Sequence, residues 1–281
     1  MELRDRLRVP PGGPVDLAAI DPAGTPGAPR AADKRWAAGE VARLGAELAD
    51  HQERLYASAK VGASRRRVLL VLQAMDCGGK DGTTRQVAGA MNPQGLRIVG
   101  FGKPTEEERR HDFLWRIRQA LPVPGYVGVF NRSHYEDVLV VRVHELVPRD
   151  VWSARYEQIN QFERELAADD TTIVKVMLHI SAKEQRKRLL LRLTDPTKHW
   201  KYNPGDVAER ALWPAYQAAY ADALARCSTG HAPWYVVPAD RKWYRNWAVA
   251  TLLRDTLVDL ALRYPMADFD IEAERRRLIG G

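Results

Sequence analysis

The sequence predicts an α/β protein in which a five-stranded parallel sheet lies between two layers of helices. Short apolar runs alternate with longer segments of helical periodicity, which is typical of right-handed strand–helix–strand units. The first run is continuously apolar, as expected for a strand that is buried on both faces. The predicted strands are Val68–Leu72, Leu96–Phe101, Tyr126–Phe130, Ile173–Ile180 and Trp234–Val237.

Helical periodicity and start signals place helices between these strands. Thr105 and Ser181 are each followed three residues later by a glutamate, so a helix with a capping box is expected to begin at each. Pro214 should start or kink the helix that contains it. Further helices are expected at about residues 31–61, 81–91, 149–169, 207–227 and 241–264.

One large domain is expected between two flanking segments. Residues 8–30 are rich in Pro, Gly and Ala, so residues 1–30 are interpreted as a flexible N-terminal arm. Residues 31–265 form the predicted domain, and residues 266–281 form a C-terminal tail.

The composition excludes several classes of protein. Of the 281 residues, 45% are hydrophobic and 28% are charged, as in ordinary globular proteins. The chain has neither an apolar run of about 18 residues nor a secretory signal, so a cytoplasmic protein without a membrane segment is expected. Two cysteines are too few for a disulfide framework or a four-thiolate metal site. A net charge of +7 favours polyanionic partners, among which nucleic acid, anionic lipid, nucleotides and polyphosphate remain open.

A glycine-rich sequence follows the first predicted strand and precedes a predicted helix. It reads Gln73-Ala74-Met75-Asp76-Cys77-Gly78-Gly79-Lys80-Asp81-Gly82-Thr83-Thr84. Strand, loop and helix in this order predict a P-loop, in which backbone N–H groups and a helix N-terminus hold phosphate while a lysine reaches the outer phosphates. Gly78, Gly79, Lys80 and Gly82 supply these parts. The alternative is a glycine-rich turn with a surface lysine.

Four residues of this loop need a further explanation. Ala74 replaces the usual first glycine, and a left-handed backbone there would be strained. Asp81 replaces the usual Ser or Thr after the lysine. Asp76 would be repelled by phosphates unless a cation intervened, which indicates a Mg²⁺ ligand or a base for the phosphoryl acceptor. Cys77 lies at a helix N-terminus, so a lowered thiol pKa and a mild sensitivity to oxidation are expected.

A second polar segment follows the third predicted strand, at the carboxyl edge where parallel sheets bind ligands. It reads Asn131-Arg132-Ser133-His134-Tyr135-Glu136-Asp137. Arg132 can donate two hydrogen bonds to one phosphate. The alternative is an ion pair between Arg132 and either Glu136 or Asp137.

A cationic helix is expected to begin near Lys183. A spacing of four residues places Lys183 with Lys187, and Arg188 with Arg192, on common stripes where like charges repel unless an anion lies between them. Such runs are often only a solvated helix face. Beside a P-loop they favour a mobile lid, at about residues 183–206.

Three motifs together resemble those of the type 2 polyphosphate kinases, which exchange phosphoryl groups between inorganic polyphosphate and nucleotides. The motifs are residues 75–82, residues 131–137 and the segment Asp195-Pro196-Thr197-Lys198-His199-Trp200-Lys201. The resemblance spans about residues 31–265. It implies a P-loop kinase-like fold with a helical lid, dependence on Mg²⁺ with Mn²⁺ as a possible substitute, adenine or guanine nucleotides as substrates, and a homo-oligomer of two or four chains.

By position, the resemblance also implies roles for individual residues. Catalytic roles fall on Asp76, Lys80, Asn131, Arg132 and Arg192, and Asp76 is also the implied metal ligand. Contacts with phosphate or nucleotide fall on Gly78, Gly79, Asp81, Gly82, Thr83, Glu136, Arg188, Lys198 and Lys201. The family often has Asp where this chain has Asn131, which leaves more of the metal role to Asp76. The form of the second motif that contains Glu136 resembles the subgroup that accepts AMP as well as ADP.

Two other functions stay open from the sequence. A P-loop suits an ATP-dependent kinase for a nucleotide or another small molecule equally well. A nucleic-acid-binding module would also use a basic surface, but no reader motif or aromatic stacking pattern accompanies it, so no nucleic-acid partner is expected.

Overall fold

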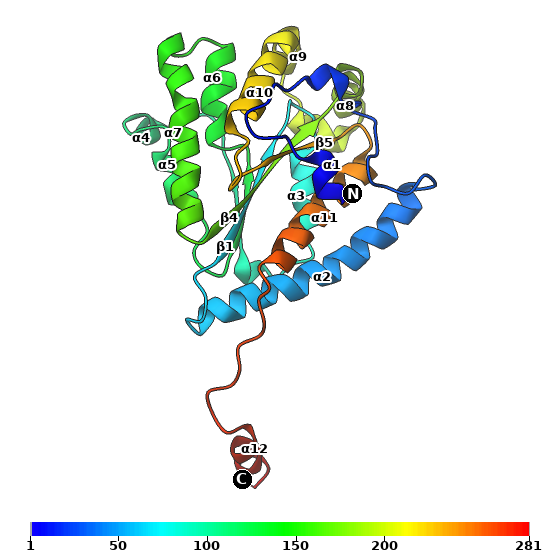
Figure 1. Cartoon of the computed structure of the whole chain (residues 1–281). Coiled ribbons are helices and arrows are strands. Elements are labelled where there is room, and N and C mark those ends of the chain that lie inside the picture. The colour runs from blue at the N-terminus through cyan, green and yellow to red at the C-terminus, as the bar shows by residue number, and fades with distance from the viewer. Residues whose placement is uncertain (1, 281) are drawn as a thin grey trace.

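The computed structural model describes residues 2–280 and confirms the predicted α/β class (Figure 1). Its five strands form one parallel sheet in the order β2-β3-β1-β4-β5. They are β1 (Arg67–Gln73), β2 (Leu96–Gly100), β3 (Val127–Asn131), β4 (Thr171–His179) and β5 (Trp234–Pro238). Every predicted strand is present, with ends that differ from the prediction by at most two residues.

The predicted helices are present in the predicted order. The α-helices are α1 (Leu3–Leu7), α2 (Lys34–Lys60), α3 (Lys80–Ala88), α4 (Glu106–Arg109), α5 (Trp115–Ala120), α6 (Val140–Val143), α7 (Arg149–Ala168), α8 (Ala182–Thr194), α9 (Asp206–Ala211), α10 (Trp213–Cys227), α11 (Lys242–Asp259) and α12 (Ile271–Gly280). Of these, α1, α5, α6 and α12 were not predicted. Short 3₁₀ helices are η1 (Leu17–Ala19), η2 (Pro93–Gly95), η3 (His134–Val138) and η4 (Pro196–Lys201). Pro214 lies in the first turn of α10, as predicted, because a proline there loses no helical hydrogen bond.

Only one of the two predicted capping boxes is complete. Thr105 N donates to Glu108 Oε2 at 2.8 Å, and Glu108 N donates to Thr105 Oγ1 at 3.2 Å. Ser181 Oγ accepts from Glu184 N at 3.0 Å, but Ser181 N donates to Asp240 Oδ1 at 2.8 Å. The predicted return bond to Glu184 is therefore wrong, because a carboxylate from a distant loop takes its place.

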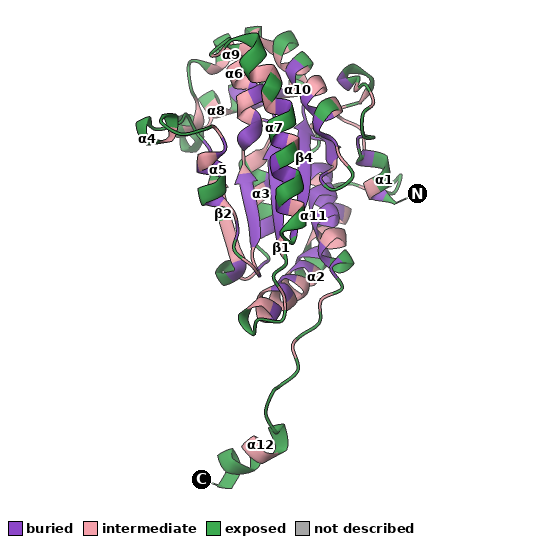
Figure 2. Cartoon of the chain, turned by 60° about the vertical axis from the view of Figure 1, so that its left-hand side comes forward, coloured by how far each residue is buried: buried purple, intermediate pink, exposed green. Residues whose placement is uncertain are grey.

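Helices cover both faces of the sheet (Figure 2). The central strand β1 sends Val68, Leu70 and Leu72 to the face where α2, α3 and α11 pack. It sends Leu69 and Val71 to the face where α5, α7 and α10 pack. All five side chains are fully buried, which confirms a strand that is buried on both sides. Ligands therefore have access to this strand only at its ends.

Part of residues 2–30, expected to be a flexible arm, lies along the edge strand β5 in this structure. Val9 N donates to Trp234 O at 2.8 Å. Leu7, Val9 and Leu17 are buried against the body. This segment therefore covers an edge that would otherwise present unpaired backbone groups.

The polar segments predicted from the sequence meet at the carboxyl edge of the sheet. The register pairs Leu72 of β1 with Asn131 of β3, so the loops that follow these two strands begin side by side. On its other side β1 pairs with β4, which leads into α8. The strands β3 and β2 lie on one side of β1, and β4 and β5 lie on the other, so the strand order reverses at β1. Open α/β sheets bind ligands at such a point.

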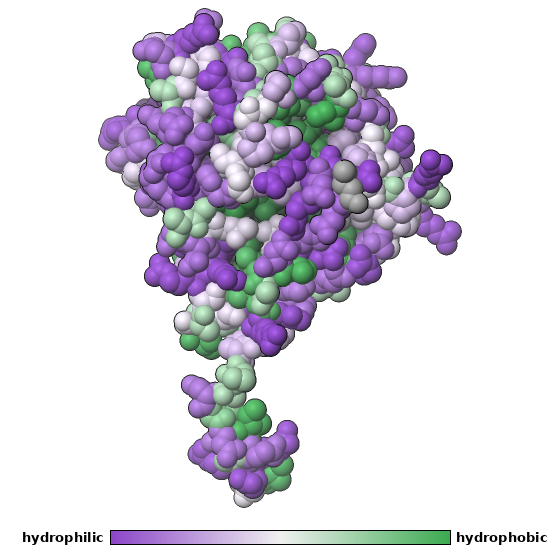
Figure 3. All heavy atoms as spheres, viewed as in Figure 1, coloured by the Kyte–Doolittle hydropathy of each residue, from purple (hydrophilic) through white to green (hydrophobic). Residues whose placement is uncertain are grey.

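The C-terminal helix α12 stands apart from the rest of the chain. Figures 1 and 2 show it at the end of an extended connection that leaves the body beside α2. The space-filling view shows hydrophobic atoms at the surface of this part (Figure 3). Among residues 2–280, none of the helices combines the length and apolar character needed to cross a membrane.

Candidate active site

A cavity of about 670 Å³ lies at the carboxyl edge of the sheet. Its walls are the loop after β1, the start of α3, the loops after β2 and β3, the segment from α8 to α9, and the start of α11. Twelve of the fourteen predicted site residues line it: Asp76, Gly78, Gly79, Lys80, Asp81, Gly82, Asn131, Arg132, Arg188, Arg192, Lys198 and Lys201. Thr83 is fully buried in α3, and Glu136 contacts the site only through Arg132.

The backbone of the loop explains why it needs its glycines. Gly79 has a left-handed backbone, with φ of 107°, and a Cβ there would lie 1.7 Å from Arg245 Nη1. A Cβ on Gly78 would lie 2.4 Å from that of Ala74. Cys77 also has a positive φ, of 61°, whereas Ala74 does not. The strain considered for Ala74 is absent because the left-handed turn falls at Cys77 and Gly79 instead.

Lys80 and the start of α3 form the cationic floor of the cavity. Lys80 Nζ donates to Ala74 O at 2.9 Å. Burial lowers the pKa of Lys80, and the guanidinium of Arg132 lowers it further, which shows how closely two cations approach here. Because α3 begins at Lys80, its first N–H groups have no acceptor within the helix. Such an N-terminus beside a lysine binds phosphate well.

Arg132 joins the second motif to the loop. Its Nη2 lies 3.1 Å from Asp76 Oδ1, and its Nη1 lies 3.5 Å from Glu136 Oε2. The ion pair with Glu136 that was considered as an alternative is therefore present, while Asp137 pairs with Arg155 at 3.0 Å. Arg132 also has a left-handed backbone, with φ of 66°. Strain of this kind persists where the surrounding structure holds a functional residue in place.

The segment from α8 to α9 closes the cavity with a second set of polar contacts. Lys201 Nζ lies 3.3 Å from Asp81 Oδ2, and Asn131 Nδ2 donates to Asp81 Oδ1 at 2.8 Å. Burial alone would raise the pKa of Asp81, but the bonds from Asn131 and Lys201 outweigh it and lower that pKa. Arg192 Nη1 lies 3.4 Å from Asp206 Oδ2. Asp81 thus connects α3, β3 and η4 around the opening.

Arg188 has no donor left for a ligand in this structure. Its five N–H groups are directed at protein acceptors: Glu184 Oε1 at 2.9 Å, Cys77 O at 2.9 Å, Gly78 O at 3.3 Å, Ala239 O at 2.7 Å and Asp240 O at 3.0 Å. The side chain ties the loop to the end of β5 and so has a positioning role here, while its contact with phosphate stays a prediction.

Replacing Arg188 with alanine should lower both stability and activity. The change leaves three carbonyl oxygens without a donor, since Gly78 O keeps its bond from Arg245 Nη1 at 3.4 Å, and the free energy of unfolding is expected to fall by about 3 kcal/mol. Urea unfolding measures this loss. Arg186→Ala, on the exposed side of the same helix, is the matched control and should change stability by less than about 0.5 kcal/mol. Equal effects of the two changes would contradict the role given to Arg188.

Four functional residues were not identified from the sequence. Asp206, Lys242 and Arg245 line the cavity, and Gln185 Nε2 donates to Asp76 O at 2.9 Å. Lys242 and Arg245 lie in the first turn of α11, directly after the carboxyl end of β5. That position, next to a strand end, was the only signal that the sequence offered for them.

Three carboxylates line this otherwise cationic cavity, and two of them, Asp76 and Asp206, repel each other. Burial raises the pKa of Asp206, and the neighbouring carboxylate of Asp76 raises it further. A divalent cation between them would relieve this repulsion. Within residues 2–280 no group of three or more His, Cys, Asp or Glu side chains is placed to hold a metal ion. A cation here would therefore complete its shell with phosphate oxygens and water, as Mg²⁺ commonly does.

The structure corrects the expectation for Cys77. Burial raises the pKa of the Cys77 thiol, and the cations Arg192 and Arg188 do not offset this effect. The sensitivity to oxidation that was expected from the helix N-terminus is therefore not supported, since the thiolate is the reactive form.

A buried ion pair holds the second motif, residues 131–137, in place. Lys175 of β4 and Glu163 of α7 are paired, and both are fully buried. Glu163 Oε1 also accepts from Tyr135 OH at 2.9 Å and lies 3.2 Å from His134 Nε2. Burial alone would raise the pKa of Glu163, but Lys175 and His134 outweigh it and lower that pKa. His134 and Tyr135 therefore fix the backbone next to Arg132 and do not face the cavity.

Replacing Lys175 with methionine should destabilise the fold strongly. The ionised Glu163 would stay buried without its cation, so the free energy of unfolding is expected to fall by about 3–5 kcal/mol. The double change Lys175→Met with Glu163→Gln should recover part of this loss, because it removes the unpaired charge. A single variant as stable as the parent in urea unfolding would show that the pair does not support the motif.

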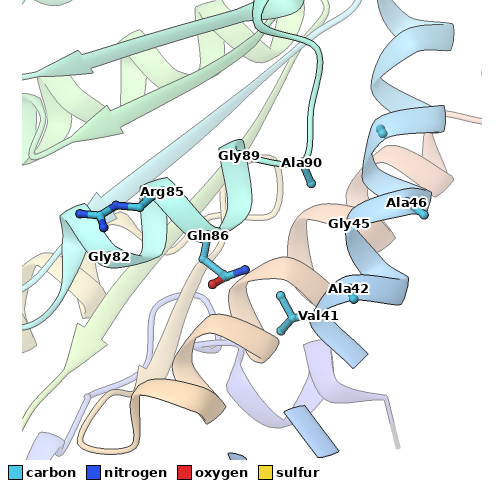
Figure 4. Close-up of a pocket in the computed structure, with 10 residues that line it drawn as sticks. Val41, Ala42, Gly45, Ala46, Gly82, Arg85, Gln86, Gly89 and Ala90 are labelled. Atoms are coloured by element: carbon cyan, nitrogen blue, oxygen red, sulfur yellow. The ribbon is translucent and has the colours of Figure 1, made fainter. Parts of the chain in front are cut away.

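A second hollow, of about 720 Å³, lies between α2 and α3 (Figure 4). It is lined mostly by small residues, namely Val41, Ala42, Gly45, Ala46, Ala49, Gly82, Arg85, Gln86, Gly89 and Ala90. Arg85 is its only charged side chain, and no carboxylate, histidine or thiol lines it. The cavity around Lys80 is therefore the better candidate for chemistry.

Known proteins share both the sequence and the fold of this chain. The family model described as polyphosphate kinase 2 matches residues 32–263. An AMP/ADP-polyphosphate phosphotransferase from Meiothermus ruber is 49% identical over 263 residues, which cover 94% of this chain and 96% of the relative. An ADP-polyphosphate phosphotransferase from Rhodopseudomonas palustris is 44% identical over 230 residues, which cover 78% of each chain.

A solved structure extends the comparison to the coordinates. The crystal structure of polyphosphate kinase 2 from Arthrobacter aurescens superimposes with a TM-score of 0.96 and 49% identity. The match covers 100% of this chain and 98% of the other. The predicted P-loop kinase-like α/β architecture is thereby confirmed. From the matched family model, the identity over most of the chain and the shared fold, we conclude that this chain belongs to the polyphosphate kinase 2 family.

Proposed function

We propose that the protein transfers phosphoryl groups between inorganic polyphosphate and nucleotides, converting AMP to ADP and ADP to ATP in reversible steps. One observation carries this proposal beyond family membership. Eight cationic side chains and only three carboxylates line a single cavity. Such an excess suits a polyanion that extends well past the phosphates of one nucleotide.

The cavity residues have different roles in an in-line phosphoryl transfer. Lys80 and Arg132 neutralise charge that develops on the moving phosphoryl group, together with the free N–H groups at the start of α3. Asp76 positions the acceptor phosphate, and its own backbone is held by Gln185. Since both phosphates bind in one cavity, transfer is direct and no phosphorylated enzyme is needed.

Asp76 and Asp206 are the residues that would hold a divalent cation, Mg²⁺ or alternatively Mn²⁺. A bound ion would neutralise part of the phosphate charge during transfer. The raised pKa of Asp206 next to Asp76 is the feature of this structure that supports the assignment. Asn131 is neutral and donates to Asp81, so it orients that carboxylate and is not a ligand in this scheme.

The cations of the segment at about residues 183–206 act as a lid in this proposal. Arg192 and Lys201 contact Asp206 and Asp81 across the opening, and these contacts would break and reform as substrates enter and leave. Lys198 now pairs with Asp195, and it would exchange that partner for polyphosphate. Domain boundaries at residues 31 and 265, and assembly into a dimer or tetramer, complete the proposal.

Glu136 is proposed to extend the acceptor range to AMP. It pairs with Arg132, so it sets the position of the guanidinium that contacts the acceptor phosphate. The Meiothermus ruber relative is named for both AMP and ADP, which supports the same range here.

A panel of acceptors tests the proposed function. Purified protein is incubated with Mg²⁺ and long-chain polyphosphate together with AMP, ADP, GMP or GDP, and the products are separated by ion-exchange chromatography. We expect ADP and ATP from AMP, and ATP from ADP. Products from ADP but none from AMP would refute the part assigned to Glu136, and no product from any acceptor would refute the whole proposal.

An ATP-dependent kinase for a nucleotide or small molecule is the alternative that a P-loop also allows. It would need a pocket for one triphosphate only, and the cations Lys242 and Arg245 beyond the loop would then have no anion to contact. The choice of phosphoryl donor separates the two functions.

A further inference from the structure

The C-terminal arm, residues 265–280, leaves the body at a firm anchor. Arg263 O accepts from Ser58 Oγ at 3.1 Å, and Tyr264 OH donates to Asp50 Oδ1 at 3.1 Å. The guanidinium of Arg54 lies 5.5 Å from the centre of the Tyr264 ring. Since these contacts hold the chain to α2 up to Tyr264, they direct the arm away from the body.

Beyond this anchor the arm bonds to itself. Ala273 N donates to Asp270 Oδ1 at 3.0 Å and so caps the start of α12. Glu272 pairs with Arg275 at 2.9 Å, and Glu274 pairs with Arg277 at 2.6 Å. Figures 1 and 2, seen from two directions, both show α12 well separated from the other helices.

The arm exposes more large apolar surface than a solvated helix would. Met266 is 95% exposed, Leu278 84%, Ile279 80%, Phe269 60% and Ile271 55%. Ile271, Leu278 and Ile279 lie within about 100° of one another around α12, so they form one apolar stripe. Figure 3 shows hydrophobic atoms at the surface of this arm. An apolar stripe of this kind normally packs against another surface.

An isolated α12 would not be stable. The helix has ten residues, and helices shorter than about 12–15 residues are marginal in water without tertiary packing. A partner is therefore required, and the body of the same chain does not supply it. The Arthrobacter aurescens crystal structure matches the whole of this chain, arm included. The match therefore extends through the arm, which is a shared part of both structures.

The charge of the arm favours a protein partner over an anionic membrane. The arm contains three arginines, at positions 275 to 277, and four acidic residues, Asp268, Asp270, Glu272 and Glu274. Helices that bind anionic lipid carry a clear excess of Lys and Arg on the polar face. The arm has no such excess, and two of its three arginines are already paired with glutamates.

We propose that the arm docks on a second copy of this chain and that two chains exchange arms reciprocally. Five large apolar side chains expose on the order of 600 Å² per arm, so one docked arm would remove about 1,200 Å² in total from water. A two-fold exchange buries about twice that area, which lies within the range of stable dimers. The stripe of Ile271, Leu278 and Ile279 is the contact surface.

The molar mass in solution tests this inference without relying on the proposed activity. Light scattering after size exclusion should give at least twice the chain mass of 31.7 kDa for the parent protein. The variant Leu278→Asp with Ile279→Asp should fall at least twofold in mass. The matched control, Val123→Asp with Val151→Asp, changes two exposed apolar residues of the body and should keep the parent mass.

Hydrogen exchange gives a second measurement that needs no variant. Amide groups of residues 271–280 should exchange at least about tenfold more slowly at concentrations where the multimer forms than after dilution to the single chain. A parent protein with the mass of one chain would overturn the inference, and so would an Asp variant that keeps the parent mass. Sedimentation of a single-chain parent with phosphatidylglycerol vesicles would instead assign the arm to a membrane surface.

Discussion

Replacing Lys80 with alanine is expected to lower kcat for phosphoryl transfer about 10³-fold. The Lys80 ammonium lies on the cavity floor beside Arg132, where we propose that it contacts the phosphoryl group that moves between donor and acceptor. Removing it leaves this stabilisation to Arg132 and the N–H groups at the start of α3 alone. Initial rates of ATP formation from polyphosphate and ADP measure the loss.

The same variant should keep its fold, because Lys80 bonds to one backbone carbonyl and does not pack in the hydrophobic core. Its thermal midpoint should match that of Lys34→Ala, which removes an exposed lysine at the start of α2. Substantial activity in a folded Lys80→Ala protein would show that the loop does not hold the reacting phosphate.

Replacing Asp76 with asparagine is expected to lower kcat about 10²–10³-fold and to raise the Mg²⁺ concentration needed for half-maximal rate at least about tenfold. Asp76 and Asp206 are the two carboxylates proposed to hold the ion, so the variant retains one of the two. Asparagine also weakens the pair with Arg132, which then depends on Glu136 alone. Rates measured across a Mg²⁺ titration separate the two effects.

Asp268→Asn, in the C-terminal arm, is the control because it also removes one carboxylate but lies outside the cavity. Its rate and its Mg²⁺ dependence should match those of the parent. If the Asp76→Asn protein loses rate but needs no more Mg²⁺ than the parent, the proposal that Asp76 holds the ion is wrong.

The parts of the fold that were predictable are those encoded in short stretches of sequence. The apolar run Val68–Leu72 is sufficient to predict a strand buried on both faces, and Pro214 predicts the start or kink of a helix, which is the start of α10. The cap of α8 was not predictable in full, because Asp240, which accepts from Ser181 N, lies 59 residues further along the chain. Contacts of that kind depend on the packing of whole elements.

The same distinction holds for the site. The loop residues and Arg132 lie in contiguous motifs at the carboxyl ends of parallel strands. Open α/β sheets bind their ligands at that edge, so the place of these residues in the site was predictable. Asp206, Lys242 and Arg245 reach the cavity only because α9 and α11 pack beside it. The bonds of Arg188 were not predictable for a similar reason, since its acceptors at Ala239 and Asp240 lie in another loop.

The choice of phosphoryl donor tests the central claim most directly. Purified protein with Mg²⁺ and AMP is given either long-chain polyphosphate or ATP, and ADP formation is followed at equal concentrations of transferable phosphate. We predict rapid phosphorylation of AMP with polyphosphate in the complete absence of ATP, and its loss in Lys80→Ala. Phosphorylation of AMP by ATP, with none by polyphosphate, would contradict the account.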